Sequence, residues 1–164
     1  MNVYLDNAAT TPMLPEVVEA MLPYMRDHFG NPPSTHQFGR RTKTAIEQSR
    51  RQIAGQLGVE PRTVCFTSGG TESDNMALHA SVDQLGCKRI LTCATEHSAV
   101  LKTAEHLGKR DDVTCGLLQL DAAGKVDLHH LAITLSDGIP TVVSVMHGNN
   151  EVGILQDIEA IGQC

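Results

Sequence analysis

Thr71 is the side chain of this sequence best suited to bind an anion, because it follows Gly69 and Gly70 at the start of a predicted helix. Glycines let a ligand approach the backbone closely, and the first amides of a helix have no partner within the helix. The helix dipole and the threonine hydroxyl favour negative charge, so the segment suits a phosphate group. An ordinary helix cap explains the same residues, since Thr71 and Asp74 have capping-box spacing. Both interpretations stay open at this point.

A histidine and an asparagine follow two later apolar runs in the same way. His97 comes after the run 89–93 and could stack on a ligand ring or transfer protons. Asn150 comes after the run 141–146, and its amide could bond a ligand oxygen. The alternatives are a surface histidine at a helix start and an ordinary asparagine turn.

Short apolar runs alternate with helical patterns from residue 63 onward, which is typical of βαβ units in a parallel sheet. The predicted strands are 63–67, 89–93, 113–118 and 141–146, and the helices between them are 71–85, 98–108 and 127–136. Such sheets bind ligands beyond the carboxyl ends of their strands. We therefore expect Thr71, His97 and Asn150 to lie around one crevice.

The segments outside this pattern predict an arm and further helices. Residues 1–15 are expected to form an N-terminal arm, and 16–164 one partial α/β domain. Helical spacing of apolar residues predicts a helix over 38–57 that ends at Gly58. A last helix begins at Asp157, and a helix in this pattern normally leads to another strand. We therefore expect the chain to be part of a longer one.

Composition excludes several classes of function. The net charge is −6 and the 13 Lys and Arg residues form no basic run, so nucleic-acid binding is not expected. No run of 18 apolar residues occurs, and the amino terminus lacks the layout of a signal peptide, which predicts a cytoplasmic protein that does not cross a membrane. The five cysteines are odd in number and show no C-x-x-C pair, so we expect free thiols and no metal site.

Five motifs of the chain stand together in a known order. They are Tyr4-Leu5-Asp6-Asn7-Ala8-Ala9-Thr10-Thr11-Pro12, Gly30-Asn31-Pro32-Pro33-Ser34-Thr35-His36, Phe66-Thr67-Ser68-Gly69-Gly70-Thr71-Glu72-Ser73-Asp74-Asn75, Thr95-Glu96-His97 and His147-Gly148-Asn149-Asn150-Glu151-Val152-Gly153. This order resembles that of the cysteine desulfurases, the NifS/IscS branch of the class V aminotransferases. The resemblance extends over essentially all 164 residues, whereas family members are more than twice as long.

The resemblance implies a fold, a cofactor and a reaction. The fold is the three-layer α/β/α large domain, with a mostly parallel sheet, of the fold-type-I transferases that use pyridoxal 5′-phosphate (PLP). The family moves sulfur from L-cysteine to an enzyme cysteine and releases L-alanine, for iron-sulfur cluster assembly or other sulfur transfer. By resemblance, Gly70 and Thr71 hold the PLP phosphate, and His97 stacks on the ring and is catalytic in proton transfer. Asn150 bonds the phenolic oxygen. A homodimer and a sulfur-accepting partner protein are implied in the same way.

Several groups that this chemistry requires do not occur in the 164 residues. PLP enzymes need an aldimine lysine and an acidic partner for the ring nitrogen. The lysines are Lys43, Lys88, Lys102, Lys109 and Lys125, and none stands in the family's Ser-x-His-Lys motif. The Asp-Ala-x-Gln motif is also missing, and Cys164 does not correspond to the sulfur-accepting cysteine. We therefore expect this chain alone to be inactive. The alternatives are a non-catalytic module that binds phosphate, PLP or a protein, and a related class V aminotransferase or selenocysteine lyase.

Overall fold

The computed structural model describes residues 2–164, which form two compact units that divide between Phe66 and Thr67. Each unit is described by itself. The expected division between an arm at 1–15 and a domain at 16–164 stays a prediction. No helix within residues 2–164 is both long enough and apolar enough to span a membrane.

The first unit is helical. It contains α1 (Pro15–Arg26), α2 (Gln37–Leu57) and a short 3₁₀ helix, η1 (Pro61–Thr63). The helix predicted over 38–57 is confirmed, and it ends as predicted at Gly58, whose φ of 67° is left-handed and therefore favours glycine. In the helices of this unit only Gly39 and Ala54 are buried, so most apolar side chains of α1 and α2 remain accessible.

The strand predicted at 63–67 is wrong. Thr63 ends η1, and the following residues form no strand. A strand is defined by its pairing, and here the backbone carbonyl of Val64 accepts a hydrogen bond from the Arg50 guanidinium instead. The same guanidinium lies 4.9 Å from the centre of the half-exposed Phe66 ring. Arg50 of α2 therefore contacts the segment for which the β-prone sequence predicted a strand.

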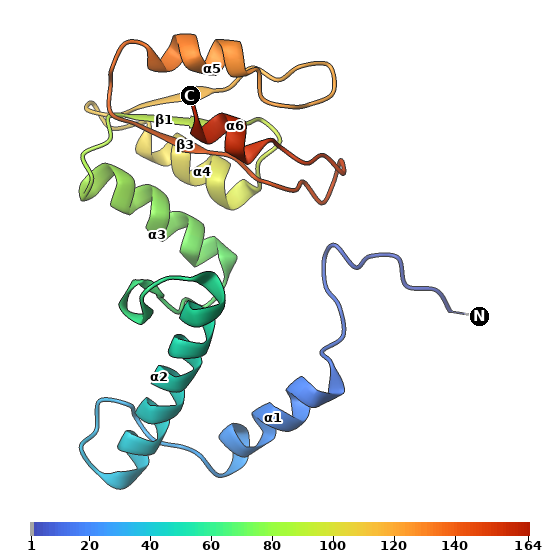
Figure 1. The fold of residues 1–164 in the computed structure, drawn as a ribbon, viewed down its shortest axis with the longest axis vertical. Coiled ribbons are helices and arrows are strands. Elements are labelled where there is room, and N and C mark those ends of the chain that lie inside the picture. Colours follow the sequence, from blue (N-terminus) through green and yellow to red (C-terminus); the bar gives the residue numbers. More distant parts are fainter. Residues whose placement is uncertain (1) are drawn as a thin grey trace. The chain divides into compact units, whose positions relative to one another are not determined.

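The second unit contains the sheet. Its strands are β1 (Arg89–Thr92), β2 (Thr114–Leu117) and β3 (Thr141–Ser144), and they confirm the three later predicted strands. The order is β2-β1-β3, and both pairings are parallel, with Ile90 opposite Cys115 on one side and Val142 on the other. The paired strands β1 and β3 are labelled in Figure 1. Because all three strands run the same way, their carboxyl ends lie at one edge of the sheet.

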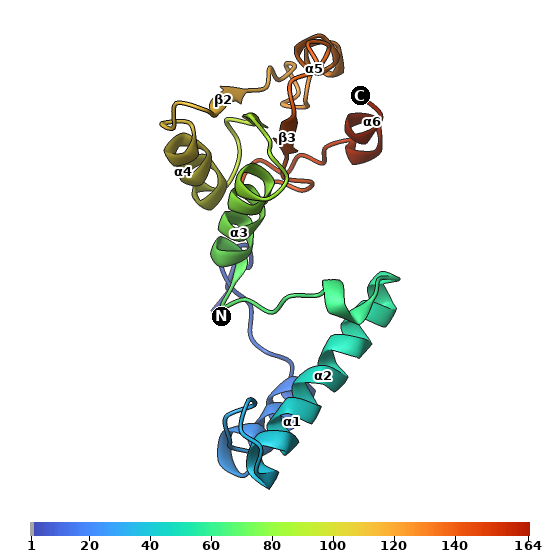
Figure 2. The ribbon, with the colours of Figure 1, turned by 90° about the vertical axis from the view of Figure 1, so that its left-hand side faces the viewer.

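Helices cover both faces of this sheet. They are α3 (Gly70–Asp83), α4 (Ser98–Leu107), α5 (Leu128–Leu135) and α6 (Ile158–Gly162). Strand side chains alternate between faces, so Ile90 packs with α3 and α4 while Leu91 packs with Leu131 of α5. Figure 2 shows α3 and α4 on one side of β3 and α5 and α6 on the other. The expected three-layer α/β/α arrangement with a parallel sheet is confirmed.

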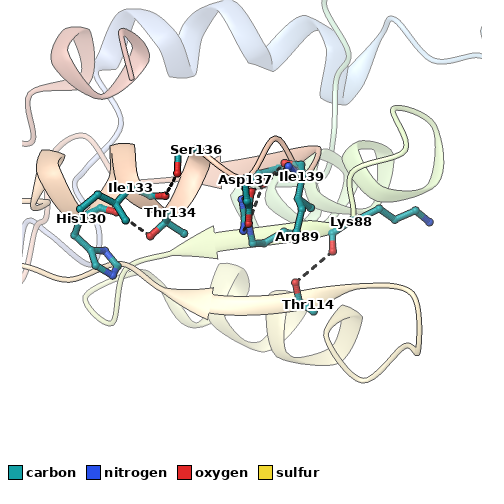
Figure 3. A network of polar contacts seen from close by, with 10 residues as sticks. Lys88, Arg89, Thr114, His130, Ile133, Thr134, Ser136, Asp137 and Ile139 are labelled. Carbon is teal, nitrogen blue, oxygen red and sulfur yellow. Dashed lines mark hydrogen bonds and ion pairs between the residues drawn. The ribbon is translucent and has the colours of Figure 1, made fainter.

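An ion pair joins the start of β1 to the loop before β3, at the amino end of the sheet (Figure 3). The largely buried Arg89 guanidinium donates to both carboxylate oxygens of Asp137, at 2.6 and 2.9 Å, and to Thr141 Oγ1 at 2.9 Å. Hydrogen bonding to Arg89 lowers the pKa of the Asp137 carboxyl. The start of β1 is thereby fixed to the loop before β3.

Candidate active site

The loops that follow β1 and β3 are hydrogen-bonded to each other at the carboxyl end of the sheet. Asn149 Nδ2 donates to the Thr95 carbonyl at 2.7 Å. The Met146 backbone N–H donates to Glu96 Oε1. These loops carry His97 and Asn150, so two of the three predicted site segments are in direct contact.

His97 is an exposed side chain that begins a helix. It is the N-cap of α4, and its Nδ1 accepts a hydrogen bond from the Ala99 N–H at 3.1 Å. A neutral imidazole that accepts at Nδ1 carries its proton on Nε2. The cap thus fixes the ring at one nitrogen and leaves the other for a ligand.

Asn150 lies in a turn that its neighbour organises. Asn149 Oδ1 accepts from the N–H groups of Glu151, at 2.8 Å, and Val152, at 2.9 Å. The side chain of Asn149 is thus engaged on both ends, whereas Asn150 is exposed. The asparagine-turn interpretation is correct for Asn149, and it leaves Asn150 accessible to a ligand.

Thr71 is exposed in the first turn of α3, and the glycines before it provide space. Gly69 is the N-cap and has extended backbone, and α3 starts at Gly70. A Cβ atom added to either glycine would meet no atom of residues 2–164 within 4 Å, the adjoining backbone aside. The first amides of a helix lack intrahelical partners. Backbone donors, a hydroxyl and open space therefore fit the phosphate of PLP.

The carboxylate that accepts hydrogen bonds at the start of α3 is that of Glu72, whereas the capping-box spacing suggested Asp74. Glu72 Oε2 accepts from Ser68 N at 2.7 Å and from Ser68 Oγ at 2.6 Å, and these bonds lower the pKa of Glu72. The pairing is thus between Glu72 and Ser68, and not between Thr71 and Asp74. The ionised Glu72 opposes an anion at the same turn, and the two Ser68 donors stabilise its ionised form.

Asn75 connects the start of α3 to α4. Its Nδ2 donates to the Thr71 carbonyl at 2.7 Å, and its Oδ1 accepts from Thr103 Oγ1 at 2.8 Å. Thr103 is a buried residue of α4, the helix that His97 begins. The Thr71 turn is therefore tied to α4, even though no strand precedes it.

Burial raises the pKa values of two groups near these loops, Glu96 and Cys93. Glu96 is 9% exposed, and this burial raises its pKa, against the lowering effect of the Met146 and His97 N–H groups. The nearby Asp74 carboxylate raises it further. Burial raises the pKa of the Cys93 thiol to about 11, which keeps that thiol protonated and unreactive at neutral pH. Within residues 2–164, no three His, Cys, Asp or Glu side chains form a group that could hold a metal ion.

Comparison with known families decides the assignment of the chain. The sequence profile of the family described as "Aminotransferase class-V" matches residues 3–164. The chain belongs to the class-V aminotransferase family. Within this family it is 43% identical, over 98% of its length, to a protein of Bacillus subtilis named "Putative cysteine desulfurase IscS 1".

Solved structures share the fold of this chain. One described as "NIFS-LIKE PROTEIN" matches 99% of this chain and 45% of its own, with 35% identity and a TM-score of 0.91. One described as "SspA in complex with cysteine" matches 95% and 45%, with 32% identity and a TM-score of 0.82. The chain spans 42% of the length of the Bacillus subtilis relative.

Three residues of this class-V aminotransferase chain form hydrogen bonds between the candidate-site segments and α4, and the sequence pattern predicted no role for them: Asn75, Glu96 and Asn149. All three occur inside the motifs that carry the family resemblance. Their bonds reach partners 28 to 54 residues away, and local spacing does not reveal such bonds. One available signal was the carboxylate of Glu96 so soon after an apolar strand, since a buried charge requires partners.

Proposed function

We propose that this chain is the amino-terminal portion of a PLP-dependent cysteine desulfurase, which moves sulfur from L-cysteine to one of its own cysteines and releases L-alanine. The observation that carries the proposal is the pair of hydrogen bonds that joins the His97 loop to the Asn150 loop at the carboxyl end of the sheet. Family membership and the names of the relatives support it. Cysteine as substrate is supported by a solved relative in complex with cysteine.

Four residues would hold the cofactor. The Gly70 and Thr71 amides and the Thr71 hydroxyl bind its phosphate, His97 stacks on the ring, and Asn150 bonds the phenolic oxygen. When bound, PLP supplies an electron sink for the carbanion that forms at the substrate. His97 gives and takes a proton at Nε2, because its Nδ1 is occupied by the Ala99 N–H.

Turnover needs groups that these 164 residues do not supply in the family motifs. None of the five lysines lies in a Ser-x-His-Lys sequence, and Lys88 and Lys109 form ion pairs with Asp112 and Glu105. The complete protein would provide the lysine, the acidic partner of the ring nitrogen and the sulfur-accepting cysteine. It would act in the cytoplasm as a homodimer that passes sulfur to a partner protein.

Cofactor binding by the isolated chain tests the proposal. PLP is added, followed by borohydride, and the product is analysed by mass spectrometry while alanine release from cysteine is measured. We expect reversible PLP binding, no attachment fixed at one lysine and no alanine. Alanine formation by this chain would contradict the assignment of the missing groups, and a lack of PLP binding would contradict the placement of the cofactor.

The variant Thr71→Ala tests whether Thr71 binds the phosphate or only caps the helix. Loss of a charge-assisted hydrogen bond is expected to weaken PLP binding about tenfold or more. Ser81→Ala is the matched control, because Ser81 lies on the same helix and its hydroxyl bonds the Ala77 carbonyl. Equal PLP affinity of the Thr71→Ala variant and the unmodified chain would favour the cap.

A further inference from the structure

Each segment of the candidate site contains one exposed polar side chain and one that is buried or half-buried. His97 is exposed and the residue before it, Glu96, is buried. Asn150 is exposed, and the residue before it, Asn149, is half-buried. Thr71 is exposed, and Asn75, one helical turn later, is half-buried. Each segment therefore presents one side chain outward and turns another toward the rest of the unit.

The inward side chains bond across segments. Glu96 and Asn149 both join the loop after β1 to the loop after β3, through Met146 N–H and the Thr95 carbonyl. Asn75 joins the Thr71 carbonyl to Thr103 of α4. Together the three side chains connect all three segments that carry Thr71, His97 and Asn150.

We propose that Asn75, Glu96 and Asn149 are positioning residues, which fix these three segments to one another so that Thr71, His97 and Asn150 face the same ligand. This inference rests on the proposed function for the identity of that ligand. A short polar side chain bonded at both ends has one orientation, and orientation is what a site of several loops needs. Asn75 and Asn149 each both donate and accept, so alanine at either position removes a complete bridge.

Glu96 offers a conservative replacement that the other two residues lack. Its Oε1 accepts from Met146 N–H, and the amide oxygen of glutamine can accept the same bond. Glu96→Ala removes the acceptor and leaves the N–H of the half-buried Met146 without this partner. A positioning role therefore predicts loss in Glu96→Ala and recovery in Glu96→Gln.

The probe is pyridoxine 5′-phosphate, because it has the ring and phosphate of PLP but no aldehyde that could react with a lysine. Its affinity for the full chain is measured by calorimetry in Asn75→Ala, Asn149→Ala, Glu96→Ala and Glu96→Gln. The control is Asp137→Ala, which breaks the ion pair at the opposite end of β1 and β3 and lies outside the binding residues. Thermal unfolding of every variant is recorded beside the affinity.

We expect each alanine variant of the three residues to bind about tenfold more weakly, Glu96→Gln to recover most of the affinity, and Asp137→Ala to bind within about twofold of the unmodified chain. The proposal would be overturned if the loss of affinity were proportional to the loss of thermal stability in every variant, Asp137→Ala included. So would unchanged affinity in Asn75→Ala and Asn149→Ala.

A ligand-free measurement separates this proposal from the proposed function. The Asn149 side-chain amide and the Met146 backbone amide are followed by hydrogen exchange in the unmodified chain. If the chain binds no pyridoxine 5′-phosphate, the proposed function fails. Slow exchange of both amides in the unmodified chain, with fast exchange of the Met146 amide in Glu96→Ala, then still supports the bridges. Fast exchange of both amides in the unmodified chain overturns them.

Discussion

His97 has a structural role and a chemical one at the same time. Its Nδ1 caps α4 by accepting from Ala99 N–H, and its ring is exposed beyond the end of β1. A substitution that removes the ring therefore also removes the cap, and the two effects must be separated before any loss of binding or activity is assigned to chemistry.

His97→Ala and His97→Asn make this separation. Asparagine caps helices well, so it should preserve the free energy of unfolding, while alanine should lower it by about 1 kcal/mol. Both variants lose the stacked ring and should bind pyridoxine 5′-phosphate more weakly. In a complete enzyme, both should lower turnover by about 10² to 10⁴, as for a positioned acid–base group. Ligand binding by His97→Asn that equals that of the unmodified chain would show that the ring does not contact the ligand.

The pKa of Glu96 is raised in the folded chain, whereas the pKa of the salt-bridged Asp137 is lowered. The two carboxylates therefore make the free energy of unfolding change with pH in opposite directions. The pKa of Glu96 in the folded chain is raised above the value of 4.5 in the unfolded chain, mainly by burial. The folded state therefore binds the proton more tightly, and the contribution of Glu96 to stability falls as the pH rises from 4.5 through the folded-state pKa. The groups that face it are Asp74, Cys93 and His97.

Glu96→Gln removes this titration. The difference in unfolding free energy between the glutamine variant and the unmodified chain should shift in favour of glutamine as the pH rises from 4 to 8. Urea unfolding at several pH values measures it. A difference that is the same at pH 4 and pH 8 would show that Glu96 titrates alike in the folded and unfolded chains.

At the scale of elements, the sheet depends on a small number of fully buried side chains. Leu131 of α5 is 0% exposed and packs with Leu91 and Leu118 on one face of the sheet. Leu131→Ala should therefore lower the free energy of unfolding by about 2–5 kcal/mol, through lost burial and a cavity. Leu128 on the same helix is 37% exposed, so Leu128→Ala is the matched control and should cost less than half as much. Equal losses in urea unfolding would contradict the packing described for α5.

Sequence patterns predicted the helices and the three paired strands because their apolar spacing reflects burial. The helix at 38–57 and the strands within 89–93, 113–118 and 141–146 were found in this way. The strand at 63–67 failed because β-prone residues do not reveal whether a partner strand exists. At the site, exposed residues after apolar runs could be named, but the bridges by Asn75, Glu96 and Asn149 depend on contacts distant in sequence.

At the scale of the whole molecule, burial is concentrated in the second unit. Both hydrophobic clusters draw their buried residues from 78–131, whereas the helices of the first unit bury only Gly39 and Ala54 among the residues described. The central strand β1 is hydrogen-bonded to a neighbour on each side. Stability should therefore differ strongly along the chain.

Hydrogen exchange of the chain tests this difference. The slowest amides should belong to β1, at Ile90, Leu91 and Thr92, and amides of residues 2–66 should exchange faster. The reason is that β1 is covered on both faces and paired at both edges, so its amides exchange only when the core opens. The slowest exchange in α2 would contradict this distribution.

The central claim is that one phosphorylated, ring-bearing ligand contacts Thr71, His97 and Asn150 together. A titration of the ¹⁵N-labelled chain with pyridoxine 5′-phosphate tests it most directly, with inorganic phosphate as the comparison. The account predicts that the amide signals of all three residues shift along one saturable curve with a single Kd, and that inorganic phosphate moves the Thr71 region alone. Shifts confined to the start of α3 with both ligands, or separate curves for the three residues, would contradict it.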